Sequence, residues 1–261
     1  MELKDNNIDK LFTEIDSNIL SVYYPAGFPK LDSTMEVLTK LQNAGANMVE
    51  LGIPFSDPMA DGVVIQEAAN RALCNGMSLK LLFEQIADMR ATITIPVILM
   101  GYINPIMKFG FENFCRKSAE TGVDGVIIPD MPFEVYETEY KEIANKYGIK
   151  VIMLITPETS DARIAKIDAA TSGFIYMVSS ASTTGAKNEF DPATIAYFQR
   201  IAAMKLSNKR LIGFGISNVS TFNAACNNAN GAIIGSQFVK LLANSDTIDT
   251  AIATLKSNIG V

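Results

Sequence analysis

Short apolar runs rich in β-branched residues recur along the whole chain, separated by longer amphipathic stretches. Apolar runs this continuous are typical of parallel strands that are covered on both faces. The expected strands are Ile19–Tyr24, Met48–Ile53, Pro96–Met100, Gly125–Ile128, Lys150–Ile155, Gly173–Val178, Arg210–Gly215 and Ala232–Gly235. The expected helices between them are Thr34–Ala44, Leu79–Ala91, Glu112–Thr121, Glu134–Lys146, Asp161–Ala170, Pro192–Met204 and Val219–Asn228.

Eight strands that alternate with helices over 261 residues predict an α/β fold, a (β/α)8 TIM barrel. A doubly wound open sheet is the alternative that this pattern leaves open. An extra helix is expected before the first strand, at Asn7–Asp16, where it would close the floor of the barrel. Gln237–Ala243 and Thr247–Asn258 predict two helical segments after the last strand, the first of them short. No linker, low-complexity tract or change in composition interrupts residues 1–261, so we expect a single domain.

The composition limits the classes of function that the chain can have. Lys and Arg number 22 against 28 Asp and Glu, and no basic block occurs, which argues against nucleic acid and anionic membranes as partners. No apolar run is long enough to span a bilayer and Met1–Asn18 has no signal-peptide core, so we expect a cytoplasmic protein. The chain has no histidine, and its three cysteines are scattered, which argues against a metal site and a disulfide framework.

Two carboxylates of the segment 49–62, Glu50 and Asp61, are the best-placed acid–base pair of the chain; the segment runs from the second expected strand into the loop after it. Glu50 stands inside an apolar run, and a buried carboxylate is costly unless it is paired or its pKa rises. Asp61 follows in a loop punctuated by proline and glycine. Because barrel active sites lie at the carboxyl ends of the strands, both side chains are expected at the mouth as acid–base groups. The alternatives are a structural ion pair for Glu50 and a local turn with Gly62 for Asp61.

Glycines end the seventh and eighth expected strands, at Gly213-Phe214-Gly215 and at Gly231 to Gly235. A short helix is expected to begin near Ser236. Glycine lets a backbone approach a ligand closely, and a helix N-terminus offers free amide groups to an anion. These two strand ends are the usual phosphate site of (β/α)8 barrels, so the sequence predicts phosphate binding there. The alternative is that the glycines only form tight strand ends.

Two further features lie near the expected barrel mouth. The loop 179–187 follows the sixth strand. Its small, polar residues are compatible with a mobile lid and equally with an ordinary solvated connection. Tyr176 lies near the end of the sixth expected strand, so its hydroxyl could reach the mouth. Because side chains of a strand alternate, only one of Tyr23 and Tyr24 can face the barrel interior. Barrel packing is the alternative role for all three tyrosines.

Several longer motifs accompany these residues. They are Glu50-Leu51-Gly52-Ile53-Pro54-Phe55-Ser56-Asp57-Pro58 with Ala60-Asp61-Gly62, Ile65-Gln66, Met100-Gly101-Tyr102-Ile103-Asn104-Pro105, Pro129-Asp130-Met131-Pro132, Gly173-Phe174-Ile175-Tyr176, Thr184-Gly185 and Gly213-Phe214-Gly215-Ile216. With these motifs the chain resembles the tryptophan synthase alpha subunit, from the first strand to the last helix. The resemblance implies a lyase of tryptophan biosynthesis that cleaves indole-3-glycerol phosphate to indole and glyceraldehyde 3-phosphate by a retro-aldol reaction.

The resemblance also implies roles for individual residues. Glu50 would be the acid and base at indole C3 and at the glyceryl hydroxyl, and Asp61 would be the partner of the indole N–H. Tyr176 would help to position both carboxylates. The residues implied to line the indole pocket are Tyr23, Ile65 and Phe214, and those implied to bind the phosphate are Gly185, Gly215, Gly235 and Ser236.

A partner is implied as well, namely a PLP-dependent beta subunit that receives indole within an alpha2beta2 heterotetramer. PLP would belong to that partner, so no cofactor is expected in this chain. The implied partner surface lies around Asp57–Ala60, Pro105–Phe109, Asp130–Phe133 and Glu158–Ser160. Two other functions stay open: a sugar-phosphate isomerase or epimerase on the same kind of barrel, and an inactive barrel that activates a partner.

Three places depart from the usual family sequence. Phe28 stands where an acidic residue is usual in the turn after the first strand. Val63 stands where proline is usual after Asp61-Gly62. Ser182 and Thr183 stand where Gly-Val is usual in the loop after the sixth strand. The catalytic pair is retained, so these differences concern the loops around the site.

Overall fold

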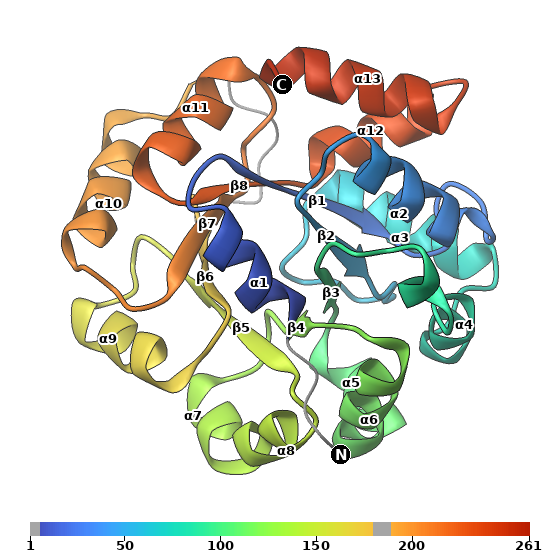
Figure 1. Ribbon diagram of the computed structural model, residues 1–261, viewed down its shortest axis with the longest axis horizontal. Coiled ribbons are helices and arrows are strands. Elements are labelled where there is room, and N and C mark those ends of the chain that lie inside the picture. Colours follow the sequence, from blue (N-terminus) through green and yellow to red (C-terminus); the bar gives the residue numbers. More distant parts are fainter. Residues whose placement is uncertain (1–5, 180–188) are drawn as a thin grey trace.

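Eight parallel strands close into a barrel in chain order, and helices surround it (Figure 1). The computed structural model describes residues 6–179 and 189–261. The prediction of a (β/α)8 barrel is confirmed, and the open sheet is excluded. The strands are β1 (Ile19–Pro25), β2 (Met48–Gly52), β3 (Val97–Met100), β4 (Gly125–Ile127), β5 (Lys150–Ile155), β6 (Phe174–Val178), β7 (Lys209–Gly213) and β8 (Gly231–Ile234).

One helix precedes the first strand, and the other helices follow the strands and surround the barrel. They are α1 (Asn7–Glu14), α2 (Ser33–Asn43), α3 (Val63–Cys74), α4 (Leu79–Gln85), α5 (Ile103–Phe109), α6 (Phe111–Thr121), α7 (Phe133–Val135), α8 (Lys141–Lys146), α9 (Asp161–Ala170), α10 (Pro192–Ala203), α11 (Val219–Asn228), α12 (Ser236–Asn244) and α13 (Ile248–Ile259), with the short helical turns η1 (Met89–Ala91) and η2 (Tyr136–Tyr140). In the described ranges, no helix is both long and apolar enough to cross a membrane.

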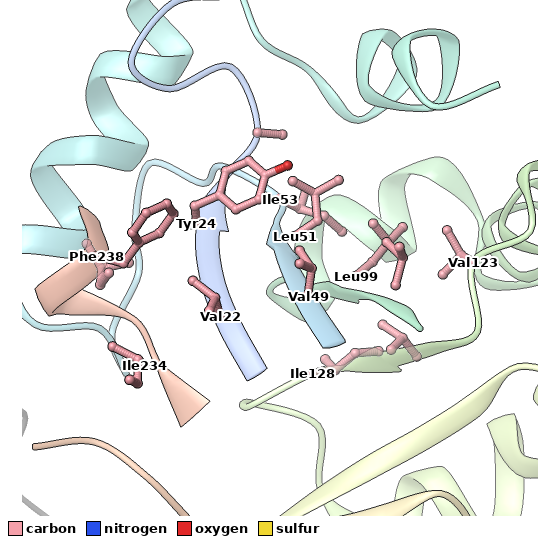
Figure 2. Close-up of a cluster of buried hydrophobic side chains, with 14 of the residues drawn as sticks. Val22, Tyr24, Val49, Leu51, Ile53, Leu99, Val123, Ile128, Ile234 and Phe238 are labelled. Carbon is pink, nitrogen blue, oxygen red and sulfur yellow. The ribbon is translucent and has the colours of Figure 1, made fainter. Parts of the chain in front are cut away.

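Each strand contributes side chains to two separate cores, because successive residues of a strand point to opposite faces. The outer core lies between the strands and the helices. Figure 2 shows part of it, with Tyr24 of β1 beside Phe238 of α12, and Val49 and Leu51 on the neighbouring β2. The inner core fills the barrel with side chains from many strands: Ile19, Met48, Ile98, Ile127, Ile152, Phe174, Leu211 and Ile233.

Helix α1 lies across one end of the barrel (Figure 1). Its apolar residues Ile8 and Leu11 join the inner core, so the helix closes the barrel floor as predicted. The carboxylate of Asp124, just before β4, accepts hydrogen bonds from the backbone N–H of Asn7 at 3.1 Å and from its side-chain amide at 2.9 Å. The helix ends at Glu14, two residues earlier than predicted, because the next residue, Ile15, is extended.

Some predicted boundaries are wrong. Strand β7 ends at Gly213 rather than Gly215, because Phe214 and Gly215 have φ angles of 68° and 74°, which take the chain out of the strand. Helix α3 was not predicted, since the residues that it buries are mostly alanines and form a weak apolar stripe. Helix α5 was also missed, because Pro105 lies in its first turn, where proline is tolerated. The expected helix Leu79–Ala91 consists of α4 and η1.

Two of the three departures from the family sequence have a clear structural setting. Phe28 is buried in the outer core, with the Arg71 guanidinium 5.5 Å from the centre of its ring. Val63 is the first residue of α3 and is 67% exposed. Proline is favoured at this position because the N–H that it lacks would have no helical partner and its fixed φ suits the helix. Ser182 and Thr183 lie outside the described residues.

Candidate active site

Glu50 lies in the middle of β2 and is fully buried. It pairs in register with Tyr23 of β1 and Ile98 of β3. Its Oε1 atom accepts a hydrogen bond of 3.0 Å from the Ser21 hydroxyl, whereas Oε2 has no partner among the described residues. Burial raises the pKa of Glu50 to about 8, and the hydrogen bond from Ser21 opposes this rise. The carboxyl group is therefore mostly protonated at neutral pH.

Asp61 lies in the loop between β2 and α3. Its Oδ2 atom accepts a hydrogen bond of 3.0 Å from the Tyr102 hydroxyl, which itself accepts one of 2.9 Å from the backbone N–H of Ala60. Burial raises the pKa of Asp61 to about 6, and the hydrogen bond from Tyr102 opposes the rise. At neutral pH Asp61 is therefore mostly ionised while Glu50 is mostly neutral. Two carboxyl groups in opposite protonation states can act as acid and base in one site.

Two tyrosine rings lie in the barrel interior beside these carboxyl groups. A Cβ atom added at Gly52 would stand 2.4 Å from the Tyr23 hydroxyl, and one at Gly213 would stand 2.1 Å from the Tyr176 hydroxyl. Only glycine therefore leaves room for each hydroxyl on the neighbouring strand. Burial, together with the charges of Glu50 and Asp61, raises the pKa of both tyrosines, so both hydroxyls are neutral.

Tyr23 and Tyr24 point to opposite sides of β1. Tyr24 belongs to the outer core, where its hydroxyl donates a hydrogen bond of 2.6 Å to the Thr34 carbonyl. Tyr23 is the inward aromatic residue, as the resemblance implied. Phe214 packs edge-on against Tyr176, with ring centres 6.1 Å apart, and so joins the inner site. Ile65 is buried on α3 in the outer core.

Three of the expected phosphate residues, Gly215, Gly235 and Ser236, lie just after β7 and β8. Gly235 immediately precedes α12, and Ser236 is the first residue of that helix, as predicted. A Cβ atom at Gly235 would lie 3.5 Å from the Tyr23 ring, so this helix start adjoins the site around Glu50. The first amide groups of a helix have no partner within it and attract an anion. Gly215 follows β7, and Gly185 lies outside the described residues.

Sequence reasoning gave no role to Ser21 and Tyr102, although both bind the carboxylates. Ser21 is the one polar side chain that is not aromatic in the expected strand Ile19–Tyr24. A polar residue in an apolar run is the signal that singled out Glu50, and it applied to Ser21 equally. Tyr102 belongs to a recognised motif at the end of β3, but its contact with Asp61 depends on how the β2–α3 loop folds.

Comparison with known proteins decides the family. The family model described as "Tryptophan synthase alpha chain" matches residues 12–260. The chain belongs to the tryptophan synthase alpha chain family. It is 59% identical to the tryptophan synthase alpha chain of Bacteroides fragilis over 97% of this chain and 96% of that one. The alpha chain of Bacteroides thetaiotaomicron is 59% identical as well, over 96% of this chain and 98% of its own length.

Solved structures agree with this assignment. A crystal structure of the tryptophan synthase alpha chain from Legionella pneumophila has a TM-score of 0.87 and 31% identity, covering 98% of this chain and 96% of that one. A structure of the tryptophan synthase complex from Pyrococcus furiosus has a TM-score of 0.82 and 35% identity, covering 94% of this chain and 97% of the other. The chain is thus a lyase of tryptophan biosynthesis whose reaction is the cleavage of indole-3-glycerol phosphate. The comparisons give no support to a sugar-phosphate isomerase or epimerase.

Replacement of Tyr102 by phenylalanine is expected to change the pH dependence of this alpha-chain reaction. The hydroxyl stabilises ionised Asp61, so its loss raises the pKa of Asp61 above about 6. Activity that needs ionised Asp61 should then begin at a pH about one unit higher. The measurement is kcat/KM for indole release across pH. Tyr197→Phe is the control, because that hydroxyl donates to the Ile155 carbonyl instead. An unchanged acid limb in Tyr102→Phe would show that this hydroxyl does not tune Asp61.

Proposed function

We propose that Glu50 and Asp61 are the acid–base pair that cleaves indole-3-glycerol phosphate in this tryptophan synthase alpha chain. The observation that carries the proposal is the pair of buried carboxyl groups on β2 and the loop after it, with pKa values of about 8 and about 6. At neutral pH the first can give a proton and the second carries a negative charge.

The reaction needs both protonation states. Neutral Glu50 gives its proton to indole C3, and the ring becomes a cation whose N1–H is stabilised by the carboxylate of Asp61. The Glu50 carboxylate then takes the proton of the glyceryl hydroxyl as that oxygen forms the aldehyde. The C–C bond breaks, and its electron pair returns to the ring to give indole. Glu50 ends the cycle protonated, as it began.

The other expected residues would bind the substrate. Tyr23, Ile65 and Phe214 would line the indole pocket, and Tyr176 would help to position the two carboxylates. Gly185, Gly215, Gly235 and Ser236 would bind the phosphate, with the start of α12 as its main donor of N–H groups. The closeness of Gly235 to Tyr23, whose ring would lie 3.5 Å from a Cβ atom added at Gly235, supports this arrangement, because it brings the expected phosphate site near the expected indole pocket.

The direct test is indole release from indole-3-glycerol phosphate by the purified chain, alone and with a beta subunit. Release by the lone chain that rises when the beta subunit is added supports both the lyase and the partner. No release in either condition from a folded protein would overturn the catalytic role of the two carboxylates. A chain that releases no indole yet activates the beta subunit would be the inactive, partner-activating barrel.

We further propose a beta-subunit surface at the four segments implied by the resemblance. Two of the segments expose methionines: Met59 in the β2–α3 loop is 93% exposed and Met107 on α5 is 46% exposed. The other two segments, Asp130–Phe133 and Glu158–Ser160, contribute to the lining of a single cavity of about 500 Å³. Exposed apolar side chains are among the features that a protein partner buries.

Several further expectations belong to this proposal. The assembly would be an alpha2beta2 heterotetramer in the cytoplasm, in which PLP is bound by the beta subunit and this chain holds neither a cofactor nor a metal. Residues 1–261 would form one domain. Chromatography of the mixed subunits at known ratio measures the stoichiometry, and the absorbance of PLP shows which subunit carries it.

Met59→Glu is expected to weaken the activation of this chain by the beta subunit. A charge in place of a nearly fully exposed apolar side chain must be desolvated when the partner covers it, which costs affinity. We expect the beta-subunit concentration that gives half of the activation to rise about tenfold. Val261→Glu is the matched control, since Val261 is also exposed but ends the chain outside the four segments. Equal activation of both variants would place the partner elsewhere.

A further inference from the structure

Ser21 carries a fully buried hydroxyl on β1. It lies on β1 two residues before Tyr23, so both side chains point to the barrel interior. In register it pairs with Met48 of β2 and with Ile233 of β8. A buried hydroxyl needs a hydrogen-bond partner, and the Ser21 hydroxyl has one in Oε1 of Glu50 at 3.0 Å.

We infer that Ser21 is a positioning residue for the cleavage reaction: its hydroxyl holds Oε1 of Glu50 and leaves Oε2 as the atom that exchanges the proton with substrate. The two oxygens of this carboxyl group are not equivalent. Oε1 accepts the hydrogen bond from Ser21, whereas Oε2 is buried without a partner in the described part of the chain. When Glu50 is neutral, its proton therefore resides on Oε2, which is the oxygen free to meet a ligand.

The hydroxyl also holds the carboxyl group in one orientation. A glutamate side chain has three rotatable bonds, and a general acid works only when its proton lies within hydrogen-bond reach of the reacting atom. Anchoring Oε1 to the rigid strand β1 removes much of this freedom before substrate arrives. Preorganisation of this kind favours the chemical step more than substrate binding.

Ser21 is also the described group that stabilises the ionised form of Glu50. Tyr23 on β1 and Tyr176 on β6 interact electrostatically with both Glu50 and Asp61, and Asp61 binds Tyr102. None of these groups is a cation. The hydrogen bond from Ser21 is what opposes the effect of burial on the pKa of Glu50.

The inference rests on the proposed role of Glu50, and three variants test it. Ser21→Ala removes the hydroxyl, and Ser21→Thr keeps it. Ser118→Ala is the matched control, because Ser118 is as deeply buried, on α6, and its hydroxyl has no partner in the described chain. The measurements are kcat, KM and their pH dependence for indole release, and an infrared titration of the Glu50 carboxyl band, which is identified by its absence in Glu50→Gln.

In Ser21→Ala we expect the pKa of Glu50 to rise by about one pH unit, both in the infrared titration and in the limb of kcat/KM that Glu50 sets. We expect kcat to fall about tenfold, with KM changed less than about twofold. Ser21→Thr should restore both values, and Ser118→Ala should leave both as they are in the unaltered chain.

A folded Ser21→Ala variant whose titration and kcat match those of the unaltered chain would overturn the inference. So would a variant that loses only stability, to the same extent as Ser118→Ala. These outcomes are separate from failure of the proposed function. If Glu50→Gln retains full activity, the role of Glu50 itself is wrong, whereas an inactive Glu50→Gln beside a fully active Ser21→Ala removes only the role of Ser21.

Discussion

Glu50→Gln is expected to remove cleavage of indole-3-glycerol phosphate while the barrel stays folded. Glutamine has nearly the same shape as glutamate, and its carbonyl oxygen can still accept the hydrogen bond from Ser21. It cannot give a proton to indole C3 or take one from the glyceryl hydroxyl. A positioned acid or base contributes about 10² to 10⁴-fold to rate, so kcat should fall by that factor. Indole release under saturating substrate measures the loss.

Glu67→Gln is the matched control for this prediction. It makes the same chemical change on an exposed residue of α3, and activity should be unaffected. Circular dichroism of both variants shows whether the fold is retained. A Glu50→Gln chain that keeps its activity within a few-fold would exclude Glu50 as the proton donor. A chain that is inactive because it no longer folds would show that Glu50 has a structural role instead.

The same substitution is expected to stabilise the protein at alkaline pH. Burial raises the pKa of Glu50 from 4.5 to about 8, so between these values the folded chain holds a proton that the unfolded chain has lost. Stability contributed by this group is present below pH 4.5 and is lost as the pH rises to about 8. The cost at higher pH amounts to as much as about 5 kcal/mol in the free energy of unfolding. Glu50→Gln carries no charge and avoids it.

Unfolding by urea at pH 5 and at pH 9 measures this effect. The free energy of unfolding of Glu50→Gln should exceed that of the unaltered chain by a few kcal/mol at pH 9 and by much less at pH 5. Asp61→Asn should show a smaller gain in the free energy of unfolding, which develops between pH 3.8 and about 6 and persists at higher pH, because the pKa of Asp61 is raised less. If the free energy of unfolding has the same pH dependence in Glu50→Gln and in the unaltered chain, folding does not raise the pKa of Glu50.

These two predictions describe one trade-off. A carboxyl group buried without an opposite charge weakens the fold at neutral and alkaline pH, and the same burial keeps the proton available for transfer. Replacing the acid therefore gains stability and loses activity. The hydroxyls of Ser21 and Tyr102 limit the cost of burial, because each donates to an oxygen of one carboxylate.

The sequence predicted those parts of the fold that depend on local pattern. Apolar β-branched runs marked all the strands of the barrel, and the start of α12 at Ser236 agreed with the structure. The end of β7 was wrong, because the left-handed backbone of Phe214 is not visible in hydrophobicity. Helix α3 was missed, because its alanines carry little apolar signal.

The parts of the site that could not be predicted depend on contacts between strands. Glu50 stood out as a charge in an apolar run, but the bond from Ser21 requires the register of β1 against β2. The sequence likewise does not show why glycine is required at Gly52 and Gly213. The reason is that tyrosine hydroxyls from neighbouring strands occupy the space next to them. A residue whose type is unusual in its segment can be found from the sequence. A residue whose role depends on a contact with another strand can be found only from the structure.

The pH dependence of kcat/KM for indole release tests the central claim most directly, because it reports the pKa values of the free enzyme's acid and base. The account predicts a bell-shaped profile, with an acid limb near the pKa of Asp61, about 6, and an alkaline limb near that of Glu50, about 8. Tyr102→Phe should move the acid limb and Ser21→Ala the alkaline limb, each to higher pH. A profile that is flat from pH 5 to pH 9, in a folded and active chain, would contradict the assignment of these two carboxyl groups as the catalytic pair.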